Sequence, residues 1–421
     1  MPIATRPPAA RVRSLSLHRG YACAHAGACC AAGWVIPVER PAAAGIRAAM
    51  RDGHLRVDGR DDTDAGALLP RPAGLPDAYG AVLGTDRLGR CLFFEPALGN
   101  GCAIHRALGE AALPVSCRQF PRVSLIDARG VAVSLSNFCP TAAGLLLRRD
   151  RPLAIDTDPP AFPATFPYEG LDARGELPPL LREDALHTPG SYDAWERFAV
   201  ALLARDDLAP EGALALLGDA ADAARQWSSP LGSVDGHLAR VTAAWLAASA
   251  PTRPRLLAEA DVAPALWSEV RDAVPQGVER PDGFTSYGEA WRSLVAPGWA
   301  RFARPVRSYL ATRAFASWVA YQGRGLRTAV AALEAALGLL RVELARACAR
   351  ADRGLDDRRF IEAAGAADHL LVHLADPAAL ASRLGAAERA PRAWPRSAGF
   401  GDRMGADSPE DTDRWPIPTR S

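Results

Sequence analysis

Seven of the chain's eight cysteines lie in the first third of its 421 residues, and thiols carry distinctive chemistry. Thiolates are the ligands that soft metals and iron–sulfur clusters prefer. Four of them suffice for a tetrahedral zinc ion or a 4Fe–4S cluster, so seven leave a surplus for a second metal, a reactive thiolate or packing. We predict a metal site that draws its ligands from Cys23, Cys29, Cys30, Cys91, Cys102, Cys117 and Cys139.

The overall composition restricts the class of protein. The chain has 49 basic and 48 acidic residues, and every basic residue is an arginine. This balance argues against a nucleic-acid partner, which would require a basic excess. Neither a signal peptide nor a membrane-spanning stretch is visible, so we expect a cytoplasmic protein without a membrane partner. Thiols stay reduced in that compartment, which favours metal binding or catalysis over disulfides.

Two predicted hairpins would bring distant cysteines together. Apolar runs at 90–94 and 102–104 flank the turn signal Asn100-Gly101, and closing this hairpin would bring Cys91 towards Cys102. A second hairpin is predicted at 122–126 and 131–136, where the residues alternate between polar and apolar. Cys117 precedes its first strand and Cys139 follows its second, so antiparallel pairing would place these two ends side by side.

The rest of the chain predicts an α+β protein, with a small cysteine-rich metal-binding domain of β-hairpins followed by an all-helical domain. We expect a disordered start at 1–18, the cysteine-rich domain at 19–149, a Pro-rich linker at 150–190, the helical domain at 191–384 and a disordered tail at 385–421. Helices are predicted at 41–50, 191–205, 210–227, 234–249, 257–273, 287–296, 298–322, 325–351 and 358–374. Ser191 and Ser286 are the expected caps of the helices that they precede.

Several residues allow a chemical and a structural interpretation. His25 and His105 lie among the cysteines and are either ligands or neighbours of the ligands. His369 and His373, four residues apart on one helical face, are expected to pack or to form hydrogen bonds. Cys348 falls on the apolar stripe of the 325–351 helix, so we expect a buried hydrophobic role.

Two arginines and two missing motifs also bear on the chemistry. Arg118 and Arg122 are candidates for binding an anionic cofactor or substrate group, or for pairing with acidic neighbours. A Gly-rich dinucleotide turn and a phosphate-binding P-loop are both missing from the sequence. No residue stands out as a catalytic base.

The segment from Cys23 to Cys30 resembles the C-x2-C-x2-C-C signature of the zinc- or iron-chelating cysteine-cluster family. The order of the later motifs is similar to that of flagellin lysine-N-methylases. These motifs are Gly33-Trp34, the loop at 101–104, the segments at 117–122 and 137–140, and, in the helical part, 307–310 and 368–373. Ala26 replaces the second cysteine of the signature. Either His25 takes over as a ligand there, or the site uses only the seven cysteines.

The resemblance implies an enzyme that moves methyl groups from S-adenosylmethionine to lysines of flagellin or a similar protein. It also implies an iron–sulfur cluster or zinc held by the cysteines. A metal would position the methyl donor, or a spare thiolate would relay the methyl group. The alternative is a non-enzymatic zinc or iron–sulfur module that carries a helical protein-interaction domain.

Overall fold

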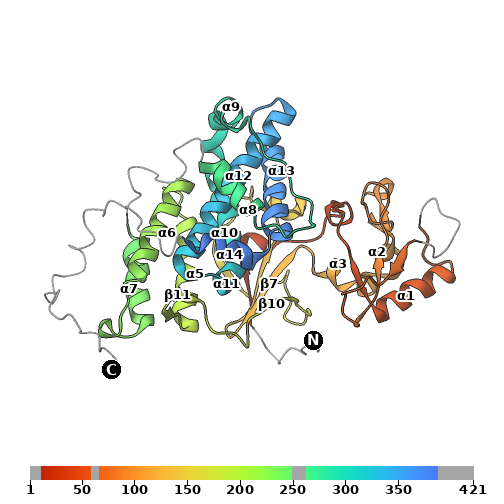
Figure 1. The fold of residues 1–421 in the computed structure, drawn as a ribbon, viewed down its shortest axis with the longest axis horizontal. Coiled ribbons are helices and arrows are strands. Elements are labelled where there is room, and N and C mark those ends of the chain that lie inside the picture. The colour runs from red at the N-terminus through yellow and green to blue at the C-terminus, as the bar shows by residue number, and fades with distance from the viewer. Residues whose placement is uncertain (1–10, 58–65, 100, 249–261, 387–421) are drawn as a thin grey trace, which may run out of the picture. The chain divides into compact units, whose positions relative to one another are not determined.

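A five-stranded mixed sheet joins segments that lie far apart in the sequence (Figure 1). The computed structural model describes residues 11–57, 66–99, 101–248 and 262–386. The sheet order is β10-β7-β8-β1-β9, formed by Gly170–Asp172, Arg122–Asp127, Gly130–Leu135, Val12–Leu15 and Ile155–Thr157. β7 and β8 form the predicted antiparallel hairpin, whereas β1 runs parallel to β8 and β10 runs parallel to β7.

The expectation of a disordered start is wrong for residues 12–18, where β1 continues into a short 3-10 turn. All four residues of β1 are buried. Two of them, Arg13 and Ser14, are polar, so the strand lacks the apolar alternation that would mark it in the sequence. Residues 1–10 lie outside the described part of the chain.

A buried ion network stabilises the position of β1 against the helices. The Arg13 guanidinium donates to the Glu196 carboxylate at 2.8 Å, and Arg129 donates to the same oxygen at 3.1 Å. Glu196 also accepts the amide of Ala316 at 3.2 Å. Its side chain is fully buried, so its charge depends on these partners instead of on water.

The helical region is arranged around the 26-residue helix α12, Leu326–Ala351. This helix packs on α8 (Val262–Arg271), α13 (Asp357–Asp368) and α6 (Pro210–Ala224), and Figure 1 shows α8 and α13 beside it. Its predicted apolar stripe is buried and includes Cys348, which confirms the hydrophobic role of that residue. These neighbouring helices cover several faces of α12.

The remaining helices are α1 (Arg40–Arg51), α2 (Ala103–Leu108), α3 (Val115–Gln119), α4 (Pro140–Leu145), α5 (Pro189–Leu203), α7 (Val234–Leu246), α9 (Tyr287–Ala290), α10 (Ala303–Ala314), α11 (Trp318–Gln322) and α14 (Pro377–Leu384). Seven short strands complete the list: β2 (Pro37–Glu39), β3 (Leu68–Pro70), β4 (Tyr79–Leu83), β5 (Phe94–Glu95), β6 (Gly101–Cys102), β11 (Leu180–Arg182) and β12 (Ala185–Leu186). The α+β class is therefore confirmed.

Four predictions about helices and their caps need correction. The single helix expected at 298–322 is a 3-10 stretch followed by α10 and α11, which separate where Ala316 adopts a left-handed φ of 55°. The cap of α5 is Thr188, and Ser191 is its partner within a capping box. Ser286 makes no side-chain cap bond to α9. The helix expected at 358–374 ends at Asp368 and continues as a wider π-type turn.

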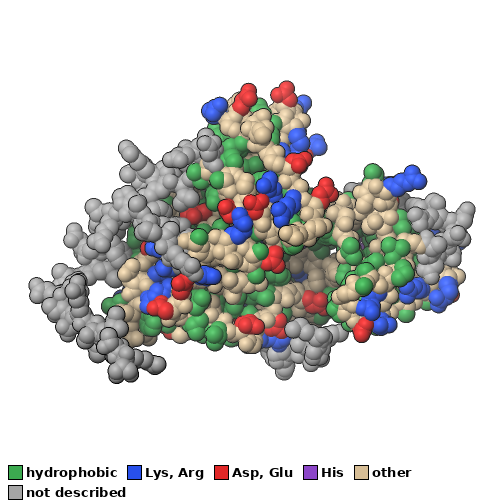
Figure 2. Space-filling model, viewed as in Figure 1, with side chains coloured by type: hydrophobic (Ala, Val, Ile, Leu, Met, Phe, Trp, Pro, Cys, Tyr) green, Lys and Arg blue, Asp and Glu red, His purple; other side chains and the backbone are tan. Residues whose placement is uncertain are grey.

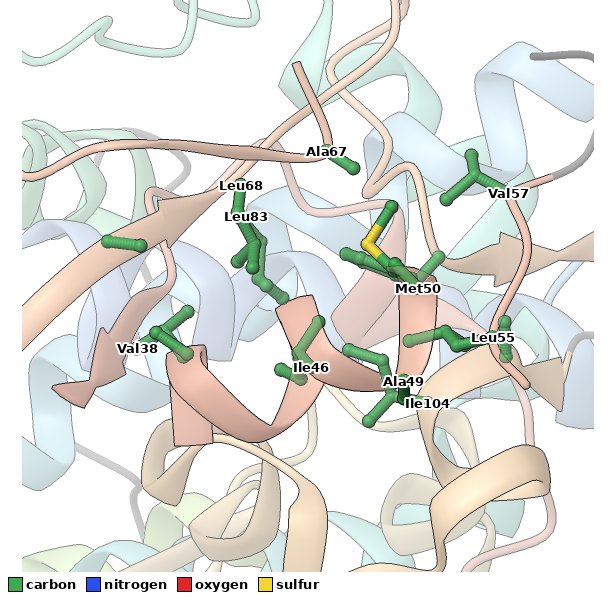
Figure 3. Packing of buried hydrophobic residues seen from close by; sticks show 14 residues of the cluster. Val38, Ile46, Ala49, Met50, Leu55, Val57, Ala67, Leu68, Leu83 and Ile104 are labelled. Carbon is green, nitrogen blue, oxygen red and sulfur yellow. The ribbon is translucent and has the colours of Figure 1, made fainter. Parts of the chain in front are cut away.

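A hydrophobic core in the N-terminal region supports three of the seven clustered cysteines. α1 packs on the sheet β2-β4-β3, where Val38, Ile46, Met50 and Leu83 form an apolar cluster (Figure 3). Cys91, Cys102 and Cys117 pack against this cluster with partly exposed side chains. Cys139 belongs to a different apolar cluster, built on β1 and β8. The cysteines are thus supported by two separate cores.

Charged side chains of both signs are interspersed on the surface of Figure 2, where the blue side chains are arginines. Many of the ion pairs in the described regions join an arginine to a carboxylate within four positions in the sequence, as in Arg197–Asp193 and Arg358–Glu362. None of the helices in these regions has the length and apolar character needed to cross a bilayer.

Acid should destabilise the fold through His18, which follows β1. This residue is fully buried, and neither ring nitrogen has a hydrogen-bond partner among the described residues. Burial, with a smaller effect of Arg313, lowers its pKa from 6.5 to about 3. The unfolded chain therefore binds a proton below pH 6.5 that the folded chain binds only near pH 3. Stability should fall by about 2 to 3 kcal/mol between pH 7 and 4.5 from this residue alone.

The variant His18→Leu tests this expectation, because it removes the group that binds the proton and puts an apolar side chain at the buried position. Urea unfolding at pH 7 and at pH 4.5 should show a smaller loss of stability in the variant than in the parent. His187 and His373, whose pKa values burial lowers to about 4 and about 3, act in the same direction in both proteins. An unchanged difference between the two pH values would contradict the assignment.

Candidate metal centre

All seven cysteines predicted as ligands line one cavity of about 310 Å³. They come from six separate places between Cys23 and Cys139, and adjacent Cys29 and Cys30 share one loop. His25, His105, Arg118 and Arg122 line the same cavity. The structure therefore brings together every residue that the sequence indicated for a metal site or for binding an anionic group.

The first hairpin positions two of these thiols. β5 pairs with β6 as predicted, with Phe94 opposite Cys102, but the hairpin is shorter than expected because helix α2 begins at Ala103. Cys102 occupies the N-cap position of α2, where the backbone amides of His105 and Ile104 act to lower the pKa of its thiol, against the larger rise from burial. Cys91 precedes β5 and receives a hydrogen bond from the amide of Phe93.

The loop with the adjacent cysteines is held against the first hairpin. Gly27 adopts a φ of 77° and starts a 3-10 turn over Ala28–Cys30. The carbonyl of Cys30 accepts the amide of Cys91 at 2.7 Å, which fixes the loop to the segment that enters β5. The sulfurs of Cys29 and Cys30 are 3.8 Å apart.

A short helix positions the next thiol. Cys117 lies in α3, and the first amide of this helix, at Val115, donates to both carboxylate oxygens of Glu39, at 3.3 and 3.2 Å. A carboxylate at a helix N-terminus is stabilising, so Glu39 at the end of β2 holds α3 in place.

The thiols divide into two electrostatic groups. Five of them act on one another: Cys29, Cys30, Cys91, Cys102 and Cys117. Cys139 instead interacts with Tyr21, and Cys23 also interacts electrostatically with Tyr21. Cys139 occupies the N-cap position of α4 and receives the amides of Thr141 and Ala142 and the Tyr21 hydroxyl. We call the larger set the five-thiol group.

Most of these thiols are protonated at neutral pH in the absence of a cation. Burial raises the pKa of Cys91 to about 12 and also raises the pKa of Cys102 and Cys117. The hydrogen bond between the adjacent cysteines lowers the pKa of Cys29 to about 7 and raises that of Cys30. A metal would therefore have to displace protons, as thiolate sites normally require.

The geometry distinguishes one ion from a larger centre. Sulfurs bound to a single tetrahedral zinc at about 2.3 Å lie about 3.8 Å from each other. The Cys29–Cys30 pair has this separation. Within the described residues, however, no three Cys, His, Asp or Glu side chains are already arranged as ligands of one ion. The seven thiols line a cavity of about 310 Å³, and an iron–sulfur cluster, in which each iron takes its own cysteine, is the larger of the two centres that such a set of thiols could hold.

The four histidines considered from the sequence as possible ligands occupy two different environments. His25 and His105 face each other across 5.6 Å between ring centroids at the cavity, so both interpretations of these residues remain open. His369 and His373 have the packing and hydrogen-bonding roles predicted for them. His369 stacks on Phe138 at 4.7 Å, and Nε2 of His373 lies 2.7 Å from the Ser136 hydroxyl.

Arg118 and Arg122 retain unused hydrogen-bonding capacity at the cavity. The Nε atoms of both are buried without a hydrogen-bond partner in the described regions. Arg122 donates through Nη1 to the Arg118 carbonyl at 2.8 Å, and its guanidinium lies 4.4 Å from the centre of the Phe166 ring. Both side chains fit the predicted role of binding an anionic group.

Two lining residues were not predicted from the sequence. Tyr21 donates to the Cys139 sulfur, and its position two residues before Cys23 is the only sequence signal for it. Glu110 is the carboxylate among the residues that line the cavity. Glu110 lies outside the predicted motif Asn100–His105, so the spacing of that motif does not indicate it as a site residue.

These features define a cysteine-lined cavity of a kind suited to soft metals, on an α+β scaffold. Comparisons of the chain with protein-family models, with curated proteins and with solved structures found no match.

Proposed function

We propose that the protein holds an iron–sulfur cluster at the cysteine-lined cavity, with the five-thiol group supplying the ligands. The observation that carries this proposal is the convergence of all seven cysteines on one cavity. The chemistry of the donors fits such a group, because backbone amides near Cys91 and Cys102 act to lower the pKa of both thiols and so favour the thiolates that a metal requires.

We further propose that the protein transfers methyl groups to lysines of flagellin or a similar protein, as its resemblance to flagellin lysine-N-methylases implies. The cluster would supply a Lewis-acidic or redox centre beside the reacting groups. Arg118 and Arg122 would hold the anionic end of the methyl donor, S-adenosylmethionine. Glu110, the carboxylate that lines the same cavity, would accept the proton of the incoming ammonium group.

The test of transfer is an assay with anaerobically purified full-length protein, labelled S-adenosylmethionine and flagellin from the same organism. We expect methyl-lysine in flagellin, and a loss of at least tenfold in rate for Glu110→Gln, since a positioned proton acceptor contributes roughly 10²–10⁴-fold. Metal content serves as the control, because Glu110→Gln should leave it unchanged. Metal-loaded protein that transfers no label would instead support the non-enzymatic module with a helical interaction domain.

A further inference from the structure

A second cavity, of about 280 Å³, lies between the five-stranded sheet and the helices. Ser124 and Ser134 line it from β7 and β8, and Thr312 and Arg313 line it from α10. Apolar side chains from α11, α12 and the segment after α13 complete its wall: Trp318, Val319, Leu333, Leu371 and Val372. Arg122 borders both this cavity and the cysteine-lined one.

Two polar groups at the second cavity have no partner. The Ser124 hydroxyl belongs to a fully buried residue and makes no hydrogen bond within the described regions. The Nε of Arg122 is buried and equally unpaired. Burying such groups without a partner is unfavourable, so a ligand that bonds to them would recover free energy on binding.

The cavity also has an uncompensated positive charge. Arg313 is neutralised by Asp368, whose buried carboxylate lies 3.5 Å away. Arg122, in contrast, has no carboxylate within 4 Å among the residues described. Glu169, at the cavity's exposed edge, interacts with Glu39 and Arg118. His373 adds no charge, because burial keeps it neutral at physiological pH.

We infer that this cavity binds a small organic carboxylate with an apolar body. The carboxylate would accept hydrogen bonds from the Arg122 guanidinium and the Ser124 hydroxyl. The apolar body would lie against Trp318, Val319 and Leu371. The volume accommodates an acid of about six carbons, near the lower end of ligand cavities. The inference requires neither the metal centre nor methyl transfer.

The test compares hexanoate with its neutral isostere hexanamide by titration calorimetry on the full-length protein. We expect hexanoate to bind roughly tenfold more tightly, because hydrogen bonds to a charged group are stronger than neutral ones. Arg122→Gln should abolish this preference. Ser124→Ala should weaken hexanoate binding without touching the thiols. The matched control is Arg350→Gln, at an exposed position on α12, which should change nothing.

A cavity-filling variant keeps the inference testable if the polar variants unfold. Ala332 lines the cavity from α12, and Ala332→Phe should occupy the space of the ligand's apolar body and abolish binding while Arg122 and Ser124 stay intact. Equal binding of the acid and the amide, no binding of either at millimolar concentration, or undiminished binding by Ala332→Phe would overturn the inference. Metal content reports separately on the cysteine-lined cavity.

Discussion

Replacing Cys102 by serine should remove most of the bound metal from the protein. Cys102 interacts with other members of the five-thiol group and lies at the N-terminus of α2, where backbone amides favour its thiolate. Losing only an outer hydrogen-bond partner lowers metal affinity by roughly 10- to 100-fold, so losing the thiolate itself should cost more. Metal analysis and visible absorption of anaerobically purified protein would measure this loss.

Two matched variants make the prediction specific. Cys348→Ala removes the one cysteine outside the cavity, which is buried on α12, and should retain full metal content. Cys23→Ser should also retain most of the metal, because Cys23 is exposed and interacts with Tyr21 instead of the five-thiol group. Equal metal content in Cys102→Ser and Cys348→Ala would contradict the assignment. Loss of metal in Cys23→Ser would show that Cys23 is one of the ligands.

Replacing Glu196 by alanine should destabilise the fold by about 3 to 5 kcal/mol, the usual cost of breaking a buried ion pair on one side. The substitution removes the closest carboxylate of Arg13, which keeps Asp193 at 3.2 Å, and one of the partners of Arg129, which keeps Asp127 at 2.7 Å. It also removes the acceptor for the amide of Ala316, where the chain takes its left-handed turn between α10 and α11. The strand β1 and this turn both depend on the same side chain.

The neighbouring Arg197 provides the control for this measurement. It forms an ion pair with Asp193 on the exposed side of α5, with 52% of its side chain accessible. Exposed pairs contribute about 0 to 1 kcal/mol, so Arg197→Ala should change stability little. Urea unfolding at pH 7 would give both values. A loss below about 1 kcal/mol for Glu196→Ala would show that the buried network contributes little net stability.

Local patterns in the sequence predicted those elements whose side chains interact with near neighbours. The β7–β8 hairpin follows from strict alternation. β5–β6 lies where the Asn100-Gly101 signal predicted a hairpin, although Gly101 itself belongs to β6 and Asn100 is outside the described residues. The α12 helix follows from an uninterrupted apolar stripe. In each case the residues that decide the structure lie within a few positions of one another.

Elements that depend on distant partners could not be predicted. β1 contains Arg13, a charged residue that the strand can bury because the distant carboxylates of Glu196 and Asp193 pair with it. The break between α10 and α11 has no glycine or proline, and Ala316 adopts its left-handed conformation where distant Glu196 accepts its amide. At the candidate site, clustering of cysteines in the sequence indicated one cavity. Their division into a five-thiol group and the Tyr21–Cys139 pair depends on which core supports each thiol.

The central claim is that cysteines from the first third of the chain bind one inorganic centre. X-ray absorption spectroscopy at the metal edge of anaerobically purified protein tests it most directly. The account predicts three or four sulfur neighbours at about 2.3 Å, with a metal–metal contribution if the centre is a cluster. A shell of oxygen or nitrogen alone at about 2.0–2.2 Å, or protein without stoichiometric metal, would contradict it.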